Sequence, residues 1–137
     1  MHPPDAKQIY SLGHSVEEFR ATPNNSNAFW PLETLEEIAE KEIAYVVENN
    51  QEIVGFLIAT YQSTTRKITW ENMYIKPAYQ KRGLAEYCFQ KTWEMARKEG
   101  AIIAEALVAS NNLSAQKMCK GLGFNSAGDY QWMLKWK

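Results

Sequence analysis

The sequence predicts an α/β protein in which one mixed β-sheet is flanked by helices. Three runs of β-branched and aromatic residues follow one another between positions 43 and 76. The segments on either side repeat apolar residues with helical spacing, and a nearly all-apolar run at 101–109 follows one of them. A strand, a helix and a second strand in that order predict a right-handed parallel crossover. The expected element order is α-α-β-β-β-α-β-α-β-β.

Length and composition indicate one ordinary globular domain. The 137 residues fit a single domain spanning 1–137, and 45% apolar with 23% charged residues is typical of a folded protein. A formal charge of −1 does not supply the basic field that nucleic-acid binding needs. No run approaches the length of a membrane span, and the N-terminus lacks a secretory signal. We therefore expect no nucleic-acid or membrane partner.

The two cysteines, Cys88 and Cys119, are too few for a disulfide framework and lack metal-ligand spacing. Both fall within helical patterns, so reduced thiols in a reducing compartment are the simpler interpretation, and we expect a cytoplasmic location. The only histidines are His2 and His14, which do not make a histidine metal site. No metal is expected.

Two helices are expected before the sheet. Residues 6–12 have helical spacing, and Val16 and Phe19 add core contacts. A stretch rich in turn residues at 20–27 leads to a second helix at 35–41, whose glutamates lie on the solvated side.

The next three strands are expected at 43–48, 53–61 and 67–76. Asn49-Asn50 is a turn signal, and Pro77 ends the third strand because proline cannot continue a central ladder. The following helix begins near Gly83 and is capped by Gly100. Its expected apolar stripe comprises Ala85, Cys88, Phe89, Thr92, Met95 and Ala96.

The C-terminal third is expected to begin with a strand at 101–109 that is covered on both faces, because the run is almost all apolar. A further helix is capped by Gly123. Its inward-facing residues are Ala115, Met118, Cys119 and Leu122. Short strands are expected around Phe124 and at 131–136. The alternation in the last strand suggests pairing or packing across a homodimer.

The junction between the third strand and the next helix carries most of the functional information. The first amides of a helix lack intrahelical partners and lie at the positive end of its dipole, which suits a phosphate. Gly83 lets a ligand approach the backbone, Ala85 keeps the first turn open, and Lys81 and Arg82 add positive charge. The alternative is an ordinary turn with a solvated Lys-Arg pair. The spacings of the nucleotide P-loop and of the dinucleotide fingerprint are absent.

This junction resembles the signature of the GNAT family of acyl-CoA N-acyltransferases. The similar motifs are Gln80-x-x-Gly83-x-Ala85, Ile75-x-Pro77, and Asn112-x-x-Ala115 followed by Gly123-Phe124. They keep family-like spacing within residues 68–124. The resemblance implies an N-acetyltransferase that moves an acetyl group from acetyl-CoA to a primary amine. It also implies a mostly antiparallel sheet with a central, splayed parallel pair and about four helices.

The resemblance also implies where acetyl-CoA binds. Its pyrophosphate would rest on the turn that follows Gln80, on the amides of Lys81, Arg82, Gly83, Leu84, Ala85 and Glu86. The pantetheine arm would lie between the splayed strands. Main-chain groups of Met73, Tyr74 and Ile75 would bond to the arm and polarise the thioester carbonyl. Asn112 either caps its helix only or also contacts the pantetheine.

Direct attack by an amine needs a base, because a lysine-type amine has a pKa of about 10.4 and is mostly protonated at neutral pH. Glu71 is the candidate, acting directly or through water. It is expected beside the acetyl group, on the same strand face as Thr69, Met73 and Ile75. The alternative is a surface glutamate on a half-exposed strand.

The sequence departs from the family pattern in two places. The usual general acid is a tyrosine four residues after the alanine of N-x-x-A, and Cys119 stands there. A thiol can donate a proton, but a cysteine on an apolar helix face is more often core. Tyr130, Tyr79 or solvent can replace the acid, or the thiolate can leave unassisted. The family's opening strand is also expected to be missing, replaced or removed, since only residues 1–4 precede Asp5.

Phe29 and Trp30 are the candidate acceptor-binding residues. They form either an aromatic wall for an apolar or cationic acceptor or an anchor for the second helix. The rival function, motivated by Cys119, is a non-catalytic acyl-CoA-binding sensor or interaction module. Binding without turnover distinguishes it from an enzyme.

Overall fold

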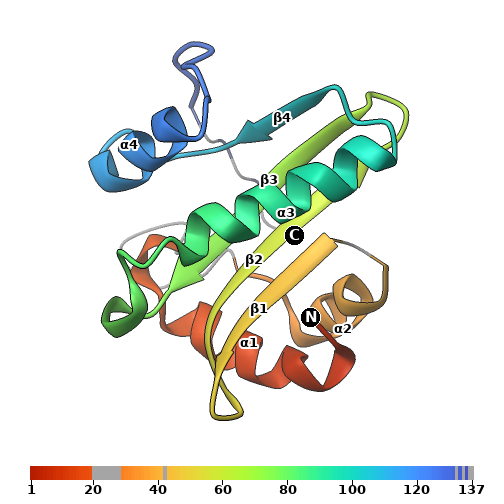
Figure 1. Cartoon of the computed structure of the whole chain (residues 1–137), viewed down its shortest axis with the longest axis vertical. Coiled ribbons are helices and arrows are strands. Elements are labelled where there is room, and N and C mark those ends of the chain that lie inside the picture. The colour runs from red at the N-terminus through yellow and green to blue at the C-terminus, as the bar shows by residue number, and fades with distance from the viewer. Residues whose placement is uncertain (20–28, 42, 132, 134, 136–137) are drawn as a thin grey trace. The chain divides into compact units, whose positions relative to one another are not determined.

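The computed structural model describes residues 1–19, 29–41, 43–131, 133 and 135 (Figure 1). The chain forms two compact units, Met1–Leu107 and Val108–Lys137. The expected strand at 131–136 falls partly outside the described residues, and its described positions 131, 133 and 135 are not in a strand. Within the described part of the chain, no helix is both long and apolar enough to span a membrane.

Among the described residues, the first unit holds ten elements of secondary structure and the second unit holds one helix. In chain order they are η1 (Pro3–Asp5), α1 (Ala6–Ser15), η2 (Glu17–Phe19), α2 (Leu32–Lys41), β1 (Ile43–Asn49), β2 (Glu52–Gln62), β3 (Lys67–Ile75), η3 (Pro77–Tyr79), α3 (Leu84–Lys98), β4 (Ile103–Ala106) and α4 (Leu113–Gly121). Four helices and the first four strands therefore confirm the sequence predictions. Residues 1–15 hold η1 and α1 and no strand, and β1 is the first strand of the sheet among the described residues.

The sheet is mixed, with the strand order β1-β2-β3-β4. Neighbours β1, β2 and β3 are antiparallel, and β3 and β4 are parallel. The connection through α3 is therefore the predicted parallel crossover. Figure 1 shows α3 lying across one face of the sheet, in front of β2 and β3.

One face of the sheet packs against α1 and α2. Phe56 and Ile58 are two positions apart in β2, so both point toward these helices. Their side chains are 1% and 0% exposed. The cluster on this face comprises Ala6, Ile9, Phe29, Leu35, Ile38, Ile53, Phe56 and Ile58. Each of its large side chains stabilises the fold by about 1.5–3 kcal/mol when it is fully buried.

The opposite face packs against α3. The indole Nε1 of Trp70 donates to Thr92 Oγ1 at 2.7 Å, and the ring meets Phe89 edge-on at a centroid distance of 4.6 Å. Cys88, Phe89, Thr92 and Ala96 are buried, as predicted. Met95 was expected in the same stripe but is 43% exposed, because helical periodicity places it at the margin of the stripe.

Two expectations for the later strands are wrong. The run at 101–109 gives only the short strand β4, with Ile103 51% and Leu107 78% exposed. The reason is that β4 is the last strand in the order of the described sheet. Phe124 is not in a strand, because its amide donates to the Cys119 carbonyl at 3.0 Å and closes the end of α4.

Gly13 in α1 lies against the Phe29 ring, and this contact yields a stability prediction. A Cβ built on Gly13 would come within 2.0 Å of the ring, whereas a Cβ on Gly121 in α4 would meet nothing within 4 Å. Gly13→Ala should lower the free energy of unfolding by about 1–3 kcal/mol through overpacking. Gly121→Ala, the matched control, should leave it unchanged or raise it by up to about 1 kcal/mol. Urea unfolding measures both, and equal stability of the two variants would contradict the contact.

Candidate active site

The turn between β3 and α3 has an unusual backbone conformation. Lys81 has φ +60° and Gly83 has φ +75°, so both lie in the left-handed region. Glycine adopts this region freely, but a lysine there costs about 1–2 kcal/mol. The Gln80 side chain spans the turn and donates from Nε2 to the Ile75 carbonyl at 2.8 Å. The turn is therefore held by a side chain of its own motif.

The N-terminus of α3 is open. Gly83 is the N-cap residue, and among the described residues no side chain caps this end. The first amide inside the helical ladder is that of Tyr87, which donates to the Gly83 carbonyl at 3.0 Å. The three amides before it, at positions 84–86, precede the ladder and lie at the positive end of the dipole. A Cβ at position 83 would meet nothing within 4 Å, so a ligand can approach these amides.

The two cations of the turn differ in their surroundings. Arg82 is turned back onto the turn, because its Nη2 donates to the Ala78 carbonyl at 3.2 Å and its guanidinium lies 5.4 Å from the Tyr79 ring centroid. Lys81 is exposed. Both charges nevertheless stay within the few residues that precede the helix end, as the sequence predicts.

Beyond Trp70, β3 has a partner on one side only. It pairs with β2 as far as Ile75, whereas its pairing with β4 ends at the Trp70–Ala106 pair. No described strand therefore pairs with residues 71–75 on the β4 side. Because unpaired backbone groups of an edge require partners, this stretch can bind an extended ligand.

A β-bulge interrupts β3 at Glu71. In the register with β2, Ile58 faces Asn72 and Ala59 faces Trp70, so Glu71 is the extra residue. Because of the bulge, the residues after Glu71 lie on other faces of the sheet than strict alternation predicts. Glu71 lies on the Thr69 face, but Met73 and Ile75 lie on the α3 face, because the extra residue reverses the alternation.

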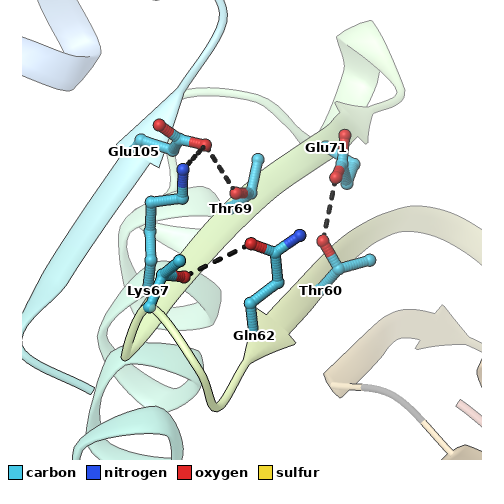
Figure 2. Close-up of polar contacts among 7 residues, drawn as sticks. Thr60, Gln62, Lys67, Thr69, Glu71 and Glu105 are labelled. Atoms are coloured by element: carbon cyan, nitrogen blue, oxygen red, sulfur yellow. Dashed lines mark hydrogen bonds and ion pairs between the residues drawn. The ribbon is translucent and has the colours of Figure 1, made fainter.

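Glu71 is one of two hydrogen-bonded carboxylates on this face (Figure 2). The Thr60 hydroxyl donates to Glu71 Oε1 at 2.8 Å, and the Glu71 side chain is exposed. On β4, Glu105 Oε1 accepts from Thr69 Oγ1 at 2.8 Å and lies 3.1 Å from Lys67 Nζ.

The pKa of Glu105 is shifted by these neighbours. Partial burial acts to raise it, but the hydrogen bonds from Thr69 and Lys67 and the positive charge of Lys67 bring the pKa below its ordinary value. Sequence reasoning missed both Glu105 and Thr60. A lone charge within an apolar run was the available signal for Glu105, whereas the partner of Thr60 depends on strand register.

The two candidate acceptor residues have different environments. Phe29 is 5% exposed and stacks on Phe19 at a centroid distance of 5.4 Å, so it belongs to the core rather than to an open wall. Trp30 is half-buried, and its Nε1 donates to Asn72 Oδ1 at 2.7 Å. Trp30 is thus tied to the residue next to Glu71 on the same strand face.

Three predicted residues belong to the second unit. Asn112 caps α4, because its Oδ1 accepts from the Ala115 amide at 3.1 Å. Cys119 is 8% exposed and burial raises its pKa, both of which fit a core cysteine. Tyr130 is 81% exposed. Their roles toward the cosubstrate remain predictions.

The first unit thus combines a mixed sheet, an N-terminus of α3 that no described side chain caps and a stretch of β3 that β4 leaves unpaired. The profile of the acetyltransferase (GNAT) family matches residues 7–124. The chain belongs to this family, and the predicted acyltransferase class is confirmed. A search of curated protein sequences found no match.

Solved structures share the fold. The aminoglycoside N-acetyltransferase AAC(6')-Iy in complex with CoA is 15% identical, with a TM-score of 0.78 over 100% of this chain and 97% of that chain. An aminoglycoside acetyltransferase from an uncultured soil metagenomic sample, in complex with sisomicin, is 14% identical, with a TM-score of 0.69 over 98% and 93%. The ribosomal-protein-S18-alanine N-acetyltransferase from Escherichia coli is 21% identical, with a TM-score of 0.70 over 93% and 76%. The predicted GNAT-like fold is therefore confirmed.

The buried thiols allow a test that depends on pH. Burial raises the pKa of Cys88 and of Cys119 above the ordinary value of 9.0. The folded chain should therefore react with a chromogenic disulfide reagent at pH 8 at least about tenfold more slowly than the urea-unfolded chain.

The raised pKa of the two thiols also makes the stability of the fold depend on pH. A thiol whose pKa is raised in the folded state stabilises the fold below its unfolded pKa, and this contribution is lost as the pH rises through the folded value. Above about pH 9, the native chain should thus lose more stability than a Cys88→Ala/Cys119→Ala variant. Rapid labelling of both thiols in the native protein would contradict their burial.

Proposed function

We propose that this GNAT-family chain transfers an acetyl group from acetyl-CoA to a primary amine by direct attack of the amine on the thioester. The observation that carries the proposal is the open N-terminus of α3, which follows a left-handed turn and adjoins the unpaired edge of β3. The helix N-terminus suits a pyrophosphate, and the unpaired strand edge suits the extended pantetheine arm.

The residues present fit CoA. The pyrophosphate would be held by the amides of residues 81–86, where Gly83 leaves open space and Lys81 adds charge. The pantetheine would lie along the β4 side of Met73, Tyr74 and Ile75, where β3 has no described partner strand. Those main-chain groups would also polarise the thioester carbonyl as negative charge develops on its oxygen.

Glu71 would receive the proton of the attacking amine, directly or through one water molecule. The amine nitrogen forms the new bond to the carbonyl carbon, the carbon–sulfur bond breaks, and CoA leaves as the thiolate. The Thr60 hydroxyl holds the Glu71 carboxylate at 2.8 Å, which fixes its orientation on the sheet. Tyr130, Tyr79 or solvent would protonate the thiolate. The buried Cys119, whose pKa burial raises, is the weakest of the candidate acids.

The acceptor class follows from the surroundings of Glu71. Glu71 precedes Asn72, which binds the half-buried indole of Trp30. A carboxylate and an indole on one strand face favour a cationic amine, because both attract positive charge. Similar structures include aminoglycoside acetyltransferases and a ribosomal-protein-alanine acetyltransferase. Aminoglycosides and peptide N-termini are therefore the first acceptors to screen. The homodimer and the cytoplasmic location remain predictions from the sequence.

Calorimetric titration with acetyl-CoA tests the binding site. Gly83→Asp should weaken binding by about tenfold or more, because the aspartate adds a negative charge and a side chain where the pyrophosphate rests. Gly121→Asp makes the same exchange in α4, outside the residues of the proposed site, and should bind like the native chain. If the folded native chain does not bind acetyl-CoA, the proposal fails.

Turnover by Glu71→Gln separates the enzyme from the non-catalytic module. The enzyme should lose about 10²–10⁴-fold in kcat, with little change in its KM for acetyl-CoA, because a positioned base contributes that much. The measurement is the rate of CoA release with an acceptor from the screen.

Glu105→Gln is the matched control, since it removes the other carboxylate of the same face, and it should retain activity. Acetyl-CoA binding without turnover, together with an unchanged Glu71→Gln variant, would instead support the sensor or interaction module.

A further inference from the structure

The hairpin between β1 and β2 contacts the turn that precedes α3. Asn49 Nδ2 donates to the Tyr79 hydroxyl at 2.9 Å, and Glu52 forms an ion pair with Lys76. These contacts join the end of β1 and the start of β2 to η3 and the residue before it. No local pattern predicts either contact, because the partners are 30 and 24 residues apart.

Tyr79 links the hairpin to the cations of the turn. Its hydroxyl accepts from Asn49, and its ring lies under the Arg82 guanidinium at 5.4 Å from the ring centroid. Arg82 also donates to the Ala78 carbonyl, on the residue before Tyr79. Between Tyr79 and the helix, Lys81 is held at φ +60°. A strained residue of this kind persists only where the surrounding contacts restrain it.

We propose that Asn49 and Tyr79 are positioning residues for the CoA-binding turn. Through their hydrogen bond, the β1–β2 hairpin holds the turn in the conformation that presents the first amides of α3 to the pyrophosphate. This inference rests on the proposed function and adds a specific pair of residues outside the family motif. The Glu52–Lys76 pair is exposed and contributes less, because surface ion pairs are screened by solvent.

The physical basis is preorganisation. Amides bind an anion well only if they point at it before it arrives, since ordering them on binding costs affinity. Asn49 is exposed and Tyr79 is half-buried, so their hydrogen bond contributes little to the free energy of unfolding. Its loss should therefore appear in CoA affinity rather than in thermal stability.

The test is calorimetric titration of the full chain with CoA. Tyr79→Phe keeps the ring beneath Arg82 and removes only the hydroxyl, and Asn49→Ala removes its partner. Each variant should bind CoA about three- to tenfold more weakly, as expected for one hydrogen bond. The double variant should bind like the single variants, because the two residues act through one contact. Thr64→Ala, in the hairpin between β2 and β3, is the control and should bind like the native chain.

The outcomes are distinct. Native binding with unchanged affinity in both single variants would overturn the positioning role and leave the proposed function standing. Losses that add in the double variant would also overturn it, because the residues would then act separately. Losses accompanied by a large fall in Tm would assign the pair a structural role instead. If the native chain itself fails to bind CoA, the proposed function falls and this inference falls with it.

Discussion

The unequal pairing of β3 is the constraint on which the rest of the site depends. One edge of this strand is bonded to β2 from Lys67 to Ile75, while the other is bonded to β4 only as far as Trp70. Beyond that point, the backbone groups on the β4 side require partners that no described strand supplies. An extended ligand can take that place, and the end of the same strand leads directly into the turn before α3.

Packing on both faces allows β3 to continue without a second neighbour. The Trp70 indole is fixed to Thr92 of α3 on one face, and Tyr74 packs with Phe56 on the face of α1 and α2. Packing on both faces anchors the strand at Trp70 and at Tyr74, on either side of Glu71, the proposed base. The bulge at Glu71 adds a second consequence, because Glu71 and Asn72 then share one face and are held separately, by Thr60 and Trp30.

Sequence patterns predicted the elements and the turn but not this bulge. Strict alternation placed Met73 on the Glu71 face, whereas the pairing of β2 with β3 reverses it. The same limit applies to Phe29 and Trp30, which are neighbours of similar chemistry. The first is in the core and the second is bonded to Asn72, a difference that depends on a strand 42 residues away in the chain. The exposed faces of β4 were missed because an apolar run does not reveal whether a strand is central or last in its sheet.

By itself the sequence determined the local chemistry of this protein, which comprises the helix and strand periods, the glycine that starts α3, the cations beside it, and membership of the GNAT family. These properties depend on residues only a few positions apart, so their spacing is enough to predict them. Only the tertiary structure decided which face carries Glu71, which residue orients it, and that Asn49 reaches Tyr79. Those contacts join segments far apart in the chain, and they are set by strand register and packing, which no local pattern encodes.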